Sequence, residues 1–158
     1  MQLQQSDPIF NRGVDVMRPA FNLEPQYRVI MLTREDWTKA TGAPPAIKGL
    51  VWFTDGSNMR EGTGAGVYGQ SVGRRLSFSL GRDATAFQAD IYAILACVYE
   101  IQSQNRSEKY VSVCSDSQVA LKALKAVRTT SLLVHQCHLY PACSGAIFGP
   151  QTHWSTRQ

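Results

Sequence analysis

Apolar positions along this chain follow two different periods, and the period predicts the type of each element. Leu50–Asp55 is a continuous apolar run that closes on a polar residue, which is typical of a strand buried on both faces. Gly64–Gln70 and Arg74–Leu80 read as two further strands joined by a hairpin turn. From Thr85 to about Gln104 the apolar residues recur every ~3.6 positions, which predicts one long amphipathic helix.

A strand and a helix then follow once more. Tyr110–Ser115 predicts a strand that ends at Asp116. The apolar positions from Val119 to Val127 predict a second amphipathic helix, with Lys122 and Lys125 on its solvent face. Three strands, a helix, a strand and a helix indicate an α/β fold with a mixed sheet flanked by helices.

The first part of the chain lacks this periodicity. Five prolines interrupt every candidate element between residues 1 and 48. We interpret residues 1–48 as a largely irregular connector with a short helix near Glu35–Lys39. Residues 49–137 are then the folded domain.

Composition narrows the class of protein. Apolar residues make up 44% of the 158 residues, so a packed core is expected and the composition is not that of a wholly disordered chain. Sixteen Lys and Arg against twelve Asp and Glu give a net charge of +4, which permits contact with a polyanion without requiring it. No acid follows Asp116, whereas several basic residues do. This asymmetry fits a phosphate-facing surface or an atypical C-terminus.

Targeting signals are not visible in the sequence. The start of the chain has no basic stretch followed by an apolar one, and no run approaches the ~20 apolar residues of a membrane span. The four cysteines are scattered, as reduced thiols of an intracellular protein would be. We therefore expect a protein of the cytoplasm or nucleus that is neither secreted nor membrane-bound.

Three acids occupy positions where elements begin or end. Asp55 and Asp116 end predicted strands, and Asp90 lies in the opening turns of the long helix, about 60° from Phe87 on its apolar stripe. Clustered carboxylates repel one another unless cations neutralise them, and an oxygen-only ligand set suits Mg²⁺ or Mn²⁺. Two such ions would support phosphodiester hydrolysis. The alternative is that these acids are turn residues or helix caps, as Asp116 before a helix would be.

Three sequence blocks carry a resemblance to a known family. Thr54–Ser57, Phe87–Ile94 and Cys114–Leu121 closely resemble the three leading blocks of ribonuclease H type 1. They look most like the ribonuclease H domain of insect-type non-LTR retrotransposon polyproteins. The stretch from Phe21 to Gly49 resembles the connector that follows reverse transcriptase there, so the similarity covers roughly residues 20–137.

The resemblance implies a fold, a site and a substrate. The fold is the ribonuclease H-like mixed sheet, and Asp55, Asp90 and Asp116 are the catalytic ligands of two Mg²⁺ (or Mn²⁺) ions, with Asp55 bridging both. The implied partner is an RNA–DNA hybrid, whose RNA strand is hydrolysed endonucleolytically. The positions implied or expected to touch nucleic acid are Gly56, Ser57, Thr85, Gln88, Lys122 and Lys125.

Two departures from the family pattern bear on activity. The family's second acid is Glu, so Asp90 retracts its carboxylate by roughly 1.5 Å, and misplacement on that scale costs ~100-fold in rate. Glu100 on the same helix points elsewhere, about 140° from Phe87, and does not compensate. The second departure lies after Cys137, where we expect the family's fifth strand, last helix and fourth Asp to be missing. Residues 138–158 are then an atypical, poorly ordered tail of a C-terminally truncated copy.

Three functional hypotheses remain open. The first is a ribonuclease acting on RNA–DNA hybrids with impaired activity. The second is a catalytically inactive remnant that binds nucleic acid through Lys122, Lys125, Arg74 and Arg75. The third is a chain that hardly folds, because a central strand without its fifth-strand neighbour exposes an edge.

Two other motifs are weaker. The glycines at 64, 66 and 69 match a dinucleotide-binding pattern, but no helix follows them, and close strand packing explains them better. The spacing of the His and Cys residues at 135, 137, 138 and 143 matches no standard zinc site.

Overall fold

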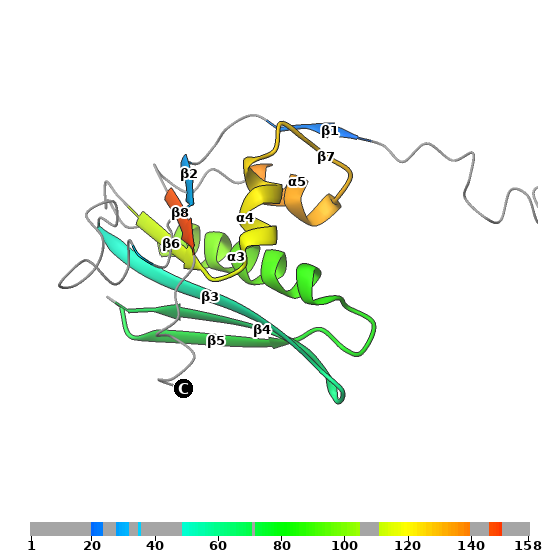
Figure 1. The fold of residues 1–158 in the computed structure, drawn as a ribbon. Coiled ribbons are helices and arrows are strands. Elements are labelled where there is room, and N and C mark those ends of the chain that lie inside the picture. Colours follow the sequence, from blue (N-terminus) through cyan, green and yellow to red (C-terminus); the bar gives the residue numbers. More distant parts are fainter. Residues whose placement is uncertain are drawn as a thin grey trace, which may run out of the picture.

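A mixed sheet with helices packed against it forms the body of the protein (Figure 1). The computed structural model describes residues 20–23, 28–31, 35, 49–70, 72–104, 111–139 and 146–149. In spatial order the six strands of the sheet are β2 (Arg28–Met31), β8 (Ala146–Gly149), β6 (Val111–Ser115), β3 (Leu50–Met59), β4 (Gly62–Gly69) and β5 (Arg74–Ser79). The helices with described bounds are α3 (Ala86–Ser103), α4 (Gln118–Lys125) and α5 (Leu132–Leu139). These elements confirm the expected α/β class.

Strand direction divides the sheet into two parts. β2, β8, β6 and β3 run parallel, whereas β4 pairs antiparallel with β3 and β5 pairs antiparallel with β4. The parallel pairing of β3 with β6 ends where Thr54 meets Ser115. β3 continues to Met59, beyond the strand end expected at Asp55, because its antiparallel partner β4 extends further than β6 does.

The core lies between α3 and the sheet. Ile91, Ile94 and Val98 on α3 are fully buried and belong to one cluster with Trp52 of β3 and Val67 of β4. Burial of each such aliphatic side chain stabilises the fold by about 1.5–3 kcal/mol. α5 packs on α3, and α4 lies towards β2 and β8. The apolar stripe expected on the long helix is therefore the face that meets the sheet.

The expectation that no strand follows Cys137 was wrong. β8 pairs in parallel with β6 on one side and with β2 on the other, so β6 has a neighbour on both edges. Four residues without alternating polarity carry little strand signal, and only the two neighbouring strands determine their conformation. α5 also extends through the first two residues of the expected tail. Residues 140–145 and 150–158, where the last helix was expected to be missing, lie outside the described residues.

Parts of the expected connector take part in the fold. β2 joins the sheet edge beside β8, and β1 (Phe21–Asn22) pairs antiparallel with β7 (Arg128–Thr129) in a separate two-stranded ribbon. Leu23 is buried, and its N–H donates to the carbonyl of Val127 at 2.8 Å. Of the helix expected at residues 35–39, only Glu35 is described, and it is helical. The boundaries at residues 48 and 137 stay predictions.

Within the described ranges, no helix has the length and apolar character needed to cross a bilayer.

Candidate metal centre

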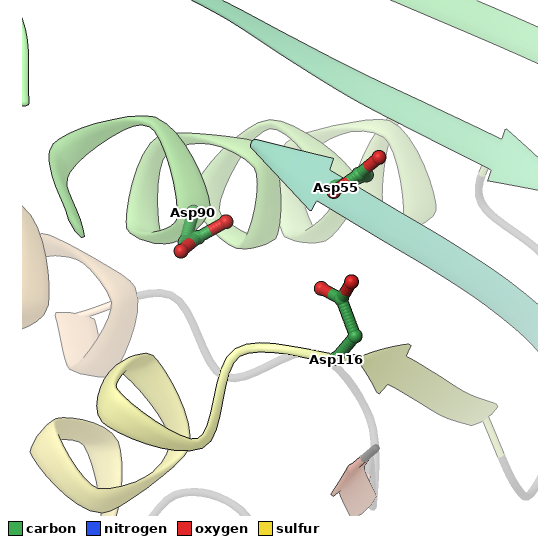
Figure 2. Close-up of side chains that lie close together, drawn as sticks. All are labelled: Asp55, Asp90 and Asp116. Carbon is green, nitrogen blue, oxygen red and sulfur yellow. The ribbon is translucent and has the colours of Figure 1, made fainter. Parts of the chain in front are cut away.

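Three carboxylates from three separate elements converge at one end of the parallel strands. Figure 2 shows Asp55 on β3, Asp90 on α3 and Asp116 directly after β6, with their side chains directed towards a shared space. One carboxylate oxygen of each lies within 4.8 Å of one oxygen of each of the others. The structure thus brings together the three acids that the sequence singles out.

The sheet register places the first and third acids. Thr54 and Ser115 are the last paired residues of β3 and β6, so the next residues, Asp55 and Asp116, leave two parallel neighbours at the same level. The Thr54 hydroxyl donates to the carbonyl of Cys114 at 3.4 Å, which ties the strands together just before they reach the site.

The turn after β6 is held by serine side chains on either side of Asp116. The N–H of Ser117 donates to Ser115 Oγ at 3.2 Å, and Ser117 Oγ in turn accepts from the N–H of Ala120 at 3.2 Å. Ser117 is therefore the N-cap of α4. The paired strand before Asp116 and the capped helix after it therefore fix the backbone position of this residue.

The second acid reaches the site because α3 crosses β3 closely at Gly56. A Cβ atom at this glycine would lie 2.5 Å from Asp90 Oδ1 and 2.6 Å from the Asp90 nitrogen. It would also lie 2.8 Å from the carbonyl carbon of Ala89. Only glycine permits this approach, so Gly56 is a packing contact of the site itself.

Burial and mutual repulsion raise the proton affinity of the cluster. Burial, followed by the charges of Asp116 and Asp90, raises the pKa of Asp55 to about 6. Burial is also the largest cause that raises the pKa of Asp90 and that of Asp116. Three partly desolvated acids of like charge therefore form a site that favours a cation or a shared proton.

Two hydrogen-bond donors lower the pKa values that burial and repulsion raise. The backbone N–H of Gly56 donates to the carboxylates of Asp55 and Asp90 and lowers the pKa of each. The Ser117 hydroxyl donates to Asp90 and lowers its pKa as well. Sequence reasoning missed Ser117, although a serine between an acid and a helix start is an N-cap signal.

The donor set fits a hard divalent cation. It consists of carboxylate oxygens alone, which Mg²⁺ and Mn²⁺ prefer, and it contains none of the nitrogen or sulfur ligands typical of zinc. Across the described part of the chain, no other group of three such residues comes together.

No family model matches the chain, and no curated protein matches it.

Two residues expected at the nucleic-acid interface form a helix cap. Thr85 Oγ1 accepts from the N–H of Gln88 at 3.1 Å, and Gln88 Oε1 accepts from the N–H of Thr85 at 2.9 Å. This reciprocal pair is a capping box at the start of α3. Both residues are exposed, so the capping hydrogen bonds do not enclose their side chains.

Three more of the expected interface residues lie at exposed positions. Ser57 is exposed on β3 opposite Gly64, and Lys122 and Lys125 are exposed on α4, the helix that Ser117 caps.

Both arginines of the alternative hypothesis have partners within the protein. Arg74 forms an ion pair with Glu100, and Arg75 lies over the ring of Tyr68, 5.0 Å from its centre. Glu100 thus contacts β5 and does not join the carboxylate cluster, in line with its angular position on the helix.

The residues weighed as zinc ligands make unrelated contacts. His135 stacks on Phe21 with ring centres 4.0 Å apart, and His138 Nε2 lies 2.9 Å from the carbonyl oxygen of Leu124. Cys137 is buried with its sulfur 3.9 Å from the carbonyl oxygen of Ile91. Cys143 lies outside the described residues.

Proposed function

We propose that this chain is a metal-dependent nuclease domain of the ribonuclease H type, which hydrolyses the RNA strand of RNA–DNA hybrids. The observation that carries the proposal is the meeting of Asp55, Asp90 and Asp116 within 4.8 Å. Each comes from a different one of the three sequence blocks that resemble that family. The fold thus brings residues that are tens of positions apart in the sequence to one point.

The fold is compatible with this proposal. A mixed sheet has its antiparallel hairpin β3–β4–β5 on one side and the parallel strands β6 and β8 on the other, with a long helix packed across β3 and β4. Such an arrangement fits a ribonuclease H-like sheet, and the retrotransposon origin rests on the resemblance alone.

The carboxylates of the three acids would hold Mg²⁺ or Mn²⁺. When bound, the ions supply activation of a water molecule and stabilise negative charge on the leaving oxygen of the phosphodiester. The protein contributes fixed ligand positions, through the register of β3 with β6 and the close crossing of α3 at Gly56. The proposed partner is a hybrid in the cytoplasm or nucleus, bound beside the cluster with help from Lys122 and Lys125.

An inactive nucleic-acid-binding remnant is the second candidate. The observation that favours it is Asp90, which stands where the family has Glu and carries its carboxylate on a shorter side chain.

Cleavage of a labelled RNA–DNA hybrid with Mg²⁺ or Mn²⁺ separates the two. We expect cleavage by the parent, loss of at least 100-fold in Asp55→Asn, and parental activity in Asp83→Asn, which removes an exposed acid outside the cluster. Salt-sensitive binding of the hybrid by a folded parent that does not cleave it would establish the remnant. A folded parent that neither cleaves nor binds the hybrid would overturn both.

A further inference from the structure

Of the three acids, Asp90 is the one whose position in the cluster is not set by the pairing of strands. Asp55 and Asp116 are set side by side by the sheet, whereas Asp90 projects from a helix that only packs on that sheet. An aspartate side chain is short, so its carboxylate joins the cluster only if the helix lies close and the carboxylate is held in one orientation. Both conditions are met by residues that are not metal ligands themselves.

Gly56 meets the first condition. The atoms that a Cβ at this position would strike include the backbone nitrogen of Asp90 and the backbone carbonyl carbon of Ala89, at 2.6 and 2.8 Å. Backbone atoms cannot swing aside as a flexible side chain does, so any larger residue moves the first turns of α3 away from β3. The Asp90 carboxylate moves with them.

Ser117 meets the second condition. A hydroxyl has one proton to donate and two lone pairs to accept with. One lone pair of Ser117 Oγ accepts from the N–H of Ala120 at 3.2 Å, which orients the hydroxyl at the start of α4. That leaves the proton for the Asp90 carboxylate, and a hydrogen bond from the Ser117 side chain lowers the pKa of that carboxyl group. The N-cap of one helix therefore holds an acid that belongs to another.

We propose that Gly56 and Ser117 are positioning residues, which bring the short Asp90 side chain into the carboxylate cluster and fix its orientation there. This inference rests on the proposed function, because it assigns the two residues to the metal centre. Partners that orient a metal ligand typically change metal affinity 10–100-fold when removed.

The test is Mn²⁺ affinity of the full chain, measured by isothermal titration calorimetry together with its melting temperature. Ser117→Gly removes the hydroxyl but keeps an acceptable N-cap residue. We expect it to weaken Mn²⁺ binding about tenfold with little change in melting temperature. Ser117→Thr keeps the hydroxyl and should bind Mn²⁺ as the parent does.

Glycine variants test the close crossing of α3. We expect Gly56→Ala to weaken Mn²⁺ binding by about 100-fold. Gly64→Ala is the matched control on the neighbouring strand, where a Cβ would lie 3.3 Å from Ser57 Oγ and 3.4 Å from the carbonyl oxygen of Phe78. That control should bind as the parent does. If Gly56→Ala does not fold, the pair of Ser117 variants decides the proposal.

The outcomes separate this inference from the proposed function. A parent that binds Mn²⁺ with Ser117→Gly equally tight would overturn the positioning role and leave the metal centre intact. A Ser117→Gly variant that melts lower but binds equally well would show a purely structural cap and overturn it too. A folded parent without Mn²⁺ affinity would overturn the metal centre and this inference together.

Discussion

The Asp55 carboxyl group holds its proton more tightly than a free aspartate does. It is half-buried and lies beside two other acids, and these causes together raise its pKa from 3.8 to about 6. Without a cation, the protein therefore carries a group near its own titration point at neutral to mildly acidic pH. Stability and cation binding should both depend on pH in this range.

The stability of the metal-free protein should fall as pH rises. Because the pKa of Asp55 is higher in the folded state, the folded protein binds more protons than the unfolded chain between pH ~4 and ~6. The contribution is fully present below the unfolded pKa and is lost as pH passes the folded one. Asp55→Asn removes this loss, so we expect it to melt a few degrees above the parent at pH 7 and near the parent at pH 4.

Thermal melts in EDTA across pH 4–8 measure this difference. The comparison between parent and Asp55→Asn isolates the one carboxyl group from the rest of the titrating protein. With Mn²⁺ added at pH 7 the order should reverse, because a bound ion stabilises the parent and not the variant. A constant difference between the two proteins at every pH would show that Asp55 titrates normally.

At the scale of single elements, the start of α3 depends on its capping box. Thr85→Ala removes the acceptor for the N–H of Gln88, so we expect the free energy of unfolding to fall by about 1 kcal/mol. Thr85→Ser keeps the acceptor and should stay near the parent. Urea denaturation followed by circular dichroism measures both, and an unchanged Thr85→Ala would point to a role of Thr85 outside the fold.

The solvent face of α4 should contribute to hybrid binding through charge alone. Lys122 and Lys125 are exposed on this helix, and each phosphate contact adds about 1 to the slope of log affinity against log salt. Replacement of both by Gln should lower that slope by about 2, with an equal effect on unrelated hybrid sequences. Fluorescence anisotropy at several salt concentrations measures the slope, and an unchanged slope would place the hybrid elsewhere.

Elements whose hydrophobic pattern extends over many residues were predictable from the sequence, whereas contacts between elements were not. α3 and the strands β3, β4 and β5 follow from hydrophobic spacing over many residues. The angular position of Asp90 on the helix also indicated that it faces the strand ends. The roles of Gly56 and Ser117 depend on how closely α3 approaches β3 and on which side chain lies next to it, and no local pattern encodes either.

At the scale of the whole molecule, β8 joins two parts of the sheet. It lies between β2 and β6, so it completes the ladder of a strand from the start of the chain and of one from the middle. The sequence reading failed here for a physical reason. A short strand that is paired on both edges is determined by its neighbours in space, and those neighbours are remote along the chain.

Removal of β8 should cost more than removal of the residues after it. A chain that ends after residue 149 keeps every described strand, whereas one that ends after residue 145 leaves β6 and β2 with unpaired edges. We expect the shorter chain to melt roughly 10 °C lower or more and to aggregate. Melting curves and light scattering compare the two, and equal stability would mean that β8 adds nothing to the sheet.

The place of β8 also sets the order in which the protein can be built during biosynthesis. β2 leaves the ribosome early, and its only described neighbour in the large sheet is β8, the last of the described strands to emerge. Until then β6 has an open edge, and pairings between remote segments are intrinsically slow to form. Between the emergence of β2 and that of β8, the nascent chain must therefore keep open strand edges from pairing with other chains, and exposed edges of this kind are what chaperones protect.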